Sequence, residues 1–393
     1  MRSRRPLPHG RGSVANGRGT VAISVAIFFF ASALVAGAQG FGGQGFGQQS
    51  LDHRIDLPHD SPVSLVGDEW GGSAANVRGG AFVLDVRVSL SLRNSSQRRI
   101  HGITLAVLAQ ETAPGGKGSI SVPSLDVAPG ESFSVRGDLH LLRPISAGTR
   151  PMVEVDLDGV LFDDLTFYGP DKLHSRRTMM VWELEARRDR RYFKTLLEQA
   201  GREGLQKELV ASLSRDADRP QFNVQTVRGR ATNADPEHDV QFAFLRFPEA
   251  PVEPMDGVAR IAGNEARTPK LVVHNRSDRI VRYLEMGWIV RDQQGREFLA
   301  ATVPAEMRLP PRSSSQILQD AALRFDPRTS IEGMTGFISS VEFMDGSFWI
   351  PSRVELDDPT LRRVVAPSPE EQRLVQIYRK KGLNAVIDEL KKF

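Results

Sequence analysis

The sequence predicts a mainly β protein made of two tandem antiparallel β-sandwich units, each followed by a helical segment that a glycine interrupts. Three observations support this fold class. The stretch 94–170 recurs 181 positions later with 15 identities in 77 ungapped positions, whereas unrelated sequences would share about 5. Apolar and polar residues alternate along several short segments. After each of these regions the apolar spacing changes to that of a helix.

Strict alternation over 84–92 predicts a half-buried strand of an antiparallel sheet. Turn residues follow at 94–97, and a return strand is expected after them. The second copy repeats this pattern, with apolar Leu271 and Val273 before a turn at 275–278. The inward positions of the two return strands agree at the 181 offset: Ile103, Leu105, Val107 and Ala109 in the first copy, and Leu284, Met286, Trp288 and Val290 in the second.

Later signals in each copy are turns followed by short strands. Pro129 and its equivalent Pro310 mark turns, and Asp164 and Asp345 mark hairpins before the aromatic pairs at 167–168 and 348–349. Short strands separated by such turns over about 110 residues are typical of an immunoglobulin-like sandwich. The cysteine pattern of antibody domains is missing, so the strand topology stays open.

The helical segments follow the sandwiches. Ser368 as N-cap, Pro369 at the first helical position and Glu371 three residues after the serine form a capping box. Apolar stripes flank Gly382 in this segment and Gly201 in the first one, and each stripe is expected to pack on its own sandwich. The expected organisation is a signal peptide at 1–38, a Gly/Gln-rich flexible spacer at 39–60, a first immunoglobulin-like sandwich at 61–175, a helical segment at 176–213, a connector at 214–239, a second sandwich at 240–360 and a C-terminal helical segment at 361–393.

The first 38 residues have the layout of a secretory signal peptide. A basic region precedes an apolar run at 21–36, and the small residues Ala36, Gly37 and Ala38 end it. The run is shorter than the ~20 residues that favour spanning a bilayer, so cleavage is expected rather than a permanent anchor. The predicted location is therefore periplasmic or secreted. Membrane contact is expected only through this segment if it stays uncleaved.

Charge and cysteine content exclude several classes of function. The chain has 51 Lys and Arg against 48 Asp and Glu, and removing 1–38 deletes five Arg and no acid, which leaves 46 against 48. A mature chain near −2 gives no basis for nucleic-acid binding. The sequence contains no cysteine, which excludes a disulfide framework and a zinc-thiolate site. No cofactor is expected, and the oligomeric state is left open.

The stretch 271–281 (LVVHNRSDRIV), with Trp288 to Asp292 and the turn at 309–311, resembles FxLYD-type immunoglobulin-like domains of bacterial envelope proteins. Those domains share the strand, the Asn-containing turn, the long strand ending near an aromatic-x-aliphatic-x-Asp, and the Pro turn. The first copy departs from this motif, because it reads Val107 to Glu111 (VLAQE) where the motif falls. The resemblance covers about 40 residues per copy. It implies the fold and no site residues.

Glu154, Asp156 and Asp158 are the candidate metal ligands. They alternate with apolar residues, so all three carboxylates are expected on one exposed strand face, where hard cations such as Ca²⁺ could bind. The alternative is a solvated face paired with arginine. The second copy has Thr335, Phe337 and Ser339 at these positions, so a metal site is no part of the shared design. Carboxylates two residues apart on one strand point the same way and do not flank a bond, so no catalytic residues are assigned.

Two further groups are candidates for an interaction surface. Tyr168 and Trp349 are repeat equivalents near a strand end, and packing at the sandwich rim is favoured over a sugar platform. A basic run lies on the first helical segment. It could dock on an anionic membrane, or it could form a solvated face with ion pairs to Glu183 and Glu185. The residues of this run are Arg187, Arg188, Arg190 and Arg191.

The sequence therefore predicts an exported, non-enzymatic structural or protein-interaction module of the bacterial cell envelope, with an envelope protein as partner. One alternative is a periplasmic ligand-binding or carbohydrate-binding protein that uses the cleft between the two units. Another is an envelope assembly chaperone, which would present an unpaired apolar edge strand. Fold alone does not decide among them.

Overall fold

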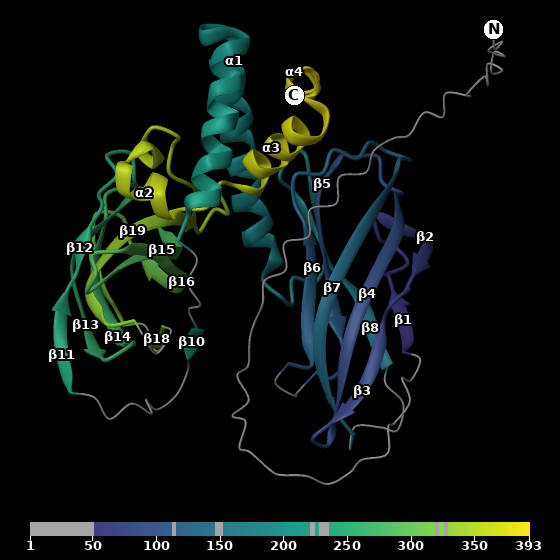
Figure 1. Cartoon of the computed structure of the whole chain (residues 1–393), viewed down its shortest axis with the longest axis horizontal. Coiled ribbons are helices and arrows are strands. Elements are labelled where there is room, and N and C mark those ends of the chain that lie inside the picture. Colours follow the sequence, from purple (N-terminus) through teal and green to yellow (C-terminus); the bar gives the residue numbers. More distant parts are fainter. Residues whose placement is uncertain are drawn as a thin grey trace, which may run out of the picture.

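The computed structural model describes residues 51–111, 115–145, 152–220, 225–227, 236–318, 322–325 and 329–393. The chain is mainly β, with several sheets and a few helices, which confirms the predicted fold class at this level (Figure 1). The expected signal peptide, most of the spacer and the middle of the connector lie outside the described residues. Within the described ranges, the structure contains no helix both long and apolar enough to cross a membrane.

The first β unit consists of two sheets. One has the order β1-β8-β5-β6, with β9 beside β8, and the other has the order β2-β4-β3, with β7 on the far side of β4. The strands are β1 (Asp52–Asp56), β2 (Val63–Glu69), β3 (Ala74–Arg78), β4 (Ala81–Asn94), β5 (Ile100–Leu108), β6 (Lys117–Val122), β7 (Ser132–Pro144), β8 (Met152–Phe162) and β9 (Phe167–Tyr168).

The two sheets of the first unit enclose one core. The alternating strand predicted at 84–92 lies within β4, and its apolar residues face those of β5 and β8. All four predicted inward residues of the return strand are in this core, namely Ile103, Leu105, Val107 and Ala109. The period-two pattern therefore located the buried face correctly, since residues on one side of a strand share one face of the sheet.

The second β unit has the same kind of architecture. One sheet runs β10-β18-β14-β13-β11 with β17 beside β14, and the other runs β12-β19-β15-β16 with β20 beside β19. The strands are β10 (Gln225–Val227), β11 (Glu237–Gln241), β12 (Ala243–Phe244), β13 (Val252–Ala262), β14 (Glu265–Asn275), β15 (Val281–Asp292), β16 (Glu297–Leu309), β17 (Ser314–Leu318), β18 (Ala322–Arg324), β19 (Ile331–Phe343) and β20 (Phe348–Trp349).

The second core also joins two sheets. Leu271 and Val273 of β14 face the inward side of β15, where Trp288 is fully buried against Phe242 with ring centroids 4.6 Å apart. The predicted inward residues of β15 are all in this core: Leu284, Met286, Trp288 and Val290.

Positions 181 residues apart make the same bonds in the two units. Asn94 Nδ2 donates to the Arg98 carbonyl at 2.7 Å, and Asn275 Nδ2 donates to the Arg279 carbonyl at 2.7 Å. Each arginine lies 3.7 Å from the centroid of a phenylalanine ring. It also pairs with the aspartate that stands two residues after that phenylalanine in the sequence. These trios are Arg98, Phe162 and Asp164 in the first unit and Arg279, Phe343 and Asp345 in the second.

Helices connect the two β units (Figure 1). Helix α1 (Ser175–Asp218) follows the first unit, and Gly201 interrupts it with φ 66° and ψ −165°, a conformation that essentially only glycine adopts. After the second unit come a 3₁₀ turn (Glu355–Asp357), α2 (Pro359–Val364), α3 (Pro369–Lys381) and α4 (Leu383–Leu390). Gly382 separates α3 from α4 with φ 81° and ψ 179°. Both predicted glycine breaks are therefore confirmed.

The apolar stripes pack on each other rather than each on its own sandwich, so that expectation is wrong for most of their length. A separate core contains Phe193, Leu205 and Leu209 of α1 together with Leu374, Val375 and Ile377 of α3 and Val386, Ile387 and Leu390 of α4. Only the start of α1 packs on the first unit, through Met179 and Met180 against Leu161. Two amphipathic helical segments bury their apolar stripes most completely when they pack against one another. The sequence of one stripe shows that the stripe is buried, but it does not show which partner covers it.

Several predicted boundaries shift. Strand β1 lies inside the expected spacer, because Ile55 packs on the first core and β1 pairs in parallel with β8. Helix α1 runs to Asp218, and β10 and β11 begin before residue 240, so the expected connector at 214–239 is largely structured where it is described.

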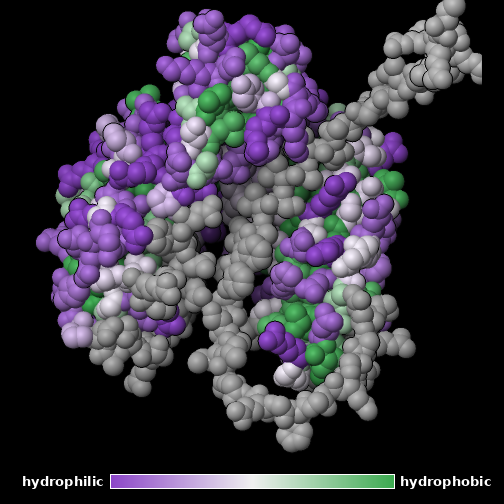
Figure 2. Space-filling view, viewed as in Figure 1, coloured by the Kyte–Doolittle hydropathy of each residue, from purple (hydrophilic) through white to green (hydrophobic). Residues whose placement is uncertain are grey.

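The face in Figure 2 is mainly hydrophilic over the second unit, with more hydrophobic residues at the surface of the first.

Candidate functional site: a buried charged junction

The three predicted metal ligands do not share one exposed face. Glu154 and Asp156 lie with Asp56 of the neighbouring β1, their ligand oxygens within 4.8 Å of one another. Asp158 is buried instead, and its Oδ1 accepts from the Leu173 backbone N–H at 3.1 Å. A register shift in the β5–β8 pairing falls at Asp158, so the strict alternation of side chains ends there.

The charges around this acidic cluster favour a structural role. Burial raises the pKa of Asp156, as do Glu154 and Asp56, whereas Lys172 and Arg54 lower it. Arg54 also pairs with Asp56 at 3.0 Å and approaches Glu154 at 3.7 Å. The cluster therefore has its own cationic partners, as the arginine-paired alternative proposed.

The two aromatic candidates pack at the rims of the sandwiches. Tyr168 lies against the first core, and its hydroxyl donates to Asp60 Oδ1 at 2.9 Å. Trp349 lies between the second core and a smaller cluster, 6.3 Å from the ring of Phe247. This is the packing role that the sequence favoured for both residues.

The arginine run contributes to a buried network instead of an open basic face. Arg187 pairs with Glu183 one helical turn earlier, with Nε 2.8 Å from Oε1, as the ion-pair interpretation proposed. Arg190 is only 5% exposed and Arg188 is mostly buried, whereas Arg191 is exposed. Burial of the two central arginines leaves no continuous cationic surface on this helix for an anionic membrane.

Arg190 joins the two halves of the chain. Its Nε donates to Glu370 Oε1 at 3.0 Å, and Glu183 lies on its other side with an oxygen 3.8 Å from Nη2. Glu370 also accepts from Arg373 at 2.8 Å and is fully buried. The ring of Phe393 lies 3.9 Å from the Arg190 guanidinium. A buried arginine that is flanked by carboxylates in this way stays charged and is held in one position.

A second set of contacts crosses between the same two segments. Ser368, the N-cap of α3, accepts from the Glu371 N–H at 3.1 Å and donates to Asp189 Oδ2 at 2.5 Å. Glu371 accepts from Arg353 at 2.6 Å and from the Ser212 hydroxyl at 2.6 Å. The predicted capping serine is confirmed, but the Glu371 side chain bonds to distant partners rather than closing the capping box.

We call this network the charged junction, and define it as Glu183, Asp189, Arg190, Arg353, Glu370 and Glu371. Burial alone would raise the pKa of Glu183, Glu370 and Glu371, but their bonded partners lower all three overall. The partners are His101 and Arg187 for Glu183, Arg373 and Arg190 for Glu370, and Arg353 and Ser212 for Glu371. The stabilisation is therefore present above the unfolded value of 4.5 and is lost as the pH falls below it.

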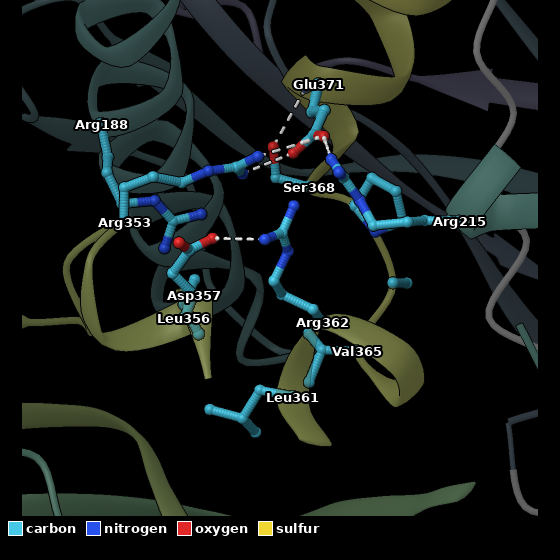
Figure 3. Close-up of a pocket in the computed structure, with 12 residues that line it drawn as sticks. Arg188, Arg215, Arg353, Leu356, Asp357, Leu361, Arg362, Val365, Ser368 and Glu371 are labelled. Atoms are coloured by element: carbon cyan, nitrogen blue, oxygen red, sulfur yellow. Dashed lines mark hydrogen bonds and ion pairs between the residues drawn. The ribbon is translucent and has the colours of Figure 1, made fainter. Parts of the chain in front are cut away.

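A small cavity of about 60 Å³ opens at the junction (Figure 3). In this view Arg353 and Arg215 point to Glu371, and Arg362 points to Asp357 at 3.3 Å. The cavity has room for a few water molecules at most. The arginines that line this cavity are already paired with carboxylates, so their contacts hold the surrounding segments together. Among the described residues, this arrangement offers no group positioned for catalysis.

Glu185 has a different environment from its neighbours in the junction. It is partly buried, and burial raises its pKa to about 7; Arg188 opposes the rise, while Asp189 and Glu285 add to it. The folded chain therefore retains a proton that the unfolded chain releases between pH 4.5 and 7, so stability falls as the pH rises through this window.

Replacing Glu185 with Gln is expected to stabilise the protein by about 1–3 kcal/mol at pH 8 and to leave it unchanged near pH 4, because the variant has no carboxylate to ionise. Urea unfolding at both pH values measures this difference. Glu198→Gln, at an exposed position on the same helix, is the control and should change neither value. Equal stability of Glu185→Gln and the native chain at pH 8 would contradict the assignment.

The sequence did not predict the charged junction. Its members are separated by up to 188 positions, and each taken alone has the form of an ordinary surface charge. One signal was available: at the 181 offset, Arg190 aligns with Glu371, so two equivalent helical positions carry opposite charges. Opposite charges at equivalent positions suit two copies that pack against each other.

Comparisons with known proteins leave the family open. No family model and no curated protein matches the chain. Among solved structures, a β-glucosidase from Kluyveromyces marxianus aligns with 66% of this chain and 45% of its own, at 7% identity and a TM-score of 0.16. An anti-sigma factor domain-containing protein aligns with 68% of this chain and 83% of its own, at 7% identity and a TM-score of 0.13. The chain thus spans less than half of the glucosidase, and such scores carry no argument about function.

Proposed function

We propose that this chain is an exported, non-enzymatic scaffold of the bacterial cell envelope, in which two immunoglobulin-like units are held together by interlocked helical segments and present surfaces to an envelope protein. The observation that carries the proposal is the charged junction. Its contacts between Arg190 and Glu370, Asp189 and Ser368, and Glu371 and Ser212 each connect α1 with the segment after the second unit.

Equivalent bonds in the two units support a duplicated domain. The Asn94 and Asn275 turns have the same geometry, and register shifts occur at equivalent places, namely beside Asp158 in β8 and beside Ser339 in β19. A strand irregularity that recurs at the same offset is expected of two copies of one domain, and it is not expected of two unrelated sheets. We infer that both units derive from one immunoglobulin-like ancestor of the FxLYD type.

The alternative is a periplasmic ligand-binding protein that uses the space between the units. One observation favours a ligand site near there: a more open cavity of about 410 Å³ lies between the end of α1 and the start of α2, lined by Arg215, Asp357, Arg362 and their neighbours. Its size is within the range of small-molecule sites. The scaffold is preferred because the charges at this position are paired with one another, as with Arg362 and Asp357.

Cell fractionation tests export and partner binding together. The full chain produced in a bacterium is expected in the periplasmic or secreted fraction with an N-terminus at Gln39, whereas a chain lacking 1–38 stays in the cytoplasm. Crosslinking of the exported chain is then expected to attach it to an envelope protein. An intact N-terminus in the cytoplasmic fraction would contradict export, and an exported chain that yields no protein crosslink would contradict the scaffold.

A further inference from the structure

A separate cavity of about 340 Å³ lies between the first β unit and the start of α1, away from the charged junction. Ser175, Thr178 and Trp182 follow one another at three- and four-residue spacing, so they share one face of the helix. Thr104 of β5 and Ser119 and Ser121 of β6 lie opposite, on the outer side of a sheet whose inner side forms the core. Figure 1 shows the elements that surround it.

Hydroxyl groups dominate the polar part of this cavity. Five hydroxyl side chains line it, belonging to Thr104, Ser119, Ser121, Ser175 and Thr178. Thr104 Oγ1 and Ser121 Oγ are bonded to each other at 3.0 Å, which leaves each of them further hydrogen-bonding capacity. Such groups both donate and accept, so they suit a ligand that does the same.

One of these hydroxyls lacks the partner that its burial demands. Ser175 is 6% exposed, lines the cavity, and its Oγ makes no hydrogen bond to any described residue. Leaving a buried hydroxyl unpaired costs about 1–3 kcal/mol, so such groups usually have a protein, water or ligand partner. The orphaned oxygen therefore indicates an occupant of this cavity that can hydrogen-bond.

The rest of the lining adds an aromatic and aliphatic wall. Trp182 is partly buried beside Met179 and lines the cavity, as do Leu139, Leu141 and Leu173. A saccharide ring has apolar C–H faces that stack on an indole and hydroxyls around its edge. A wholly apolar ligand would leave Ser175 unpaired. A strongly charged ligand would find no buried counterion, because both ionisable lining residues are exposed: Lys117 at the start of β6, and His140, which lies 2.5 Å from Asp85.

We propose that this cavity binds a neutral saccharide of one or two rings, stacked on Trp182 and hydrogen-bonded by the hydroxyls of Ser175, Thr178 and the β6 serines. The volume lies within the ~300–1,000 Å³ of small-ligand sites and holds a disaccharide. The site belongs to the first unit and the start of its helix alone. It goes beyond the scaffold role and does not depend on it.

Isothermal titration calorimetry of residues 39–393 with maltose, cellobiose and N,N′-diacetylchitobiose tests the proposal. Saturable binding of at least one disaccharide is expected, with a Kd of about 1 mM or tighter. Trp182→Ala is expected to weaken it at least about tenfold by removing the stacking wall. Trp70→Ala is the matched control, because Trp70 is a partly buried tryptophan of the same unit that stacks on His53 outside the cavity.

A second variant guards against loss of folding. Thr178→Phe adds a ring that fills the cavity from the helix side, and it should abolish binding while the melting temperature stays near that of the native chain. Absence of heat with all three disaccharides at about 10 mM would overturn the proposal. Binding that persists in both Trp182→Ala and Thr178→Phe would also overturn it, because the saccharide would then bind elsewhere.

Discussion

Replacing Arg190 with Met is expected to lower the free energy of unfolding by about 2–4 kcal/mol. The substitution retains most of the side-chain volume but leaves the buried carboxylates of Glu370 and Glu183 with one cation fewer, while Arg373 and Arg187 still compensate in part. Chemical denaturation at pH 7 measures the change. The loss should shrink towards pH 4, where protonation of the carboxylates removes the unpaired charge.

Two further variants separate the ion pair from general packing. Arg190→Met combined with Glu370→Gln is expected to recover much of the loss, because neither partner is then a buried unpaired charge. Arg191→Met is the matched control on the next, exposed position and should change stability by less than about 0.5 kcal/mol. Equal effects of Arg190→Met and Arg191→Met would show that the junction contributes no stability.

Replacing Phe193 with Ala is expected to cost about 3–5 kcal/mol, the range for deleting a fully buried phenylalanine. Phe193 is 0% exposed and lies in the core that α1 shares with α3 and α4. Its loss opens a cavity between the two helical segments. Both segments should therefore loosen together, which hydrogen exchange would detect as faster exchange in α3 and α4 as well as in α1.

The matched control for this variant is Thr195→Ala, two residues along the same helix at an exposed position. It should change the unfolding free energy by less than about 0.5 kcal/mol. Faster exchange in Phe193→Ala that is confined to α1 would contradict a shared helical core.

Local pattern was sufficient for much of the fold. Period-two alternation placed Leu84 to Leu92 and both return strands on the correct faces, since the inward direction of a strand depends only on its own residues and a single buried side. Glycine breaks and the Ser368 N-cap were equally local. Each is decided by backbone geometry within one turn of helix.

Features that depend on distant partners escaped prediction. The bulge at Asp158 changes the direction of one side chain, and alternation contains no sign of it. The burial of Arg190 depends on Glu370, 180 residues away, so the arginine run had the form of a solvated surface. The stripe around Phe193 was recognised as apolar, but its partner is the other helical segment rather than the nearest sandwich. Amphipathicity shows that a face is buried and not what buries it.

The central claim is that the helical segments fix the two units relative to each other, and a distance distribution between the units tests it most directly. The chain has no cysteine, so Val77→Cys in β3 and Met255→Cys in β13, both at exposed positions, give one clean pair of spin labels for pulsed electron paramagnetic resonance. A single narrow distribution is expected in this labelled chain, broadening when Phe193→Ala is added. A broad distribution without that substitution, or one that Phe193→Ala leaves unchanged, would contradict the claim.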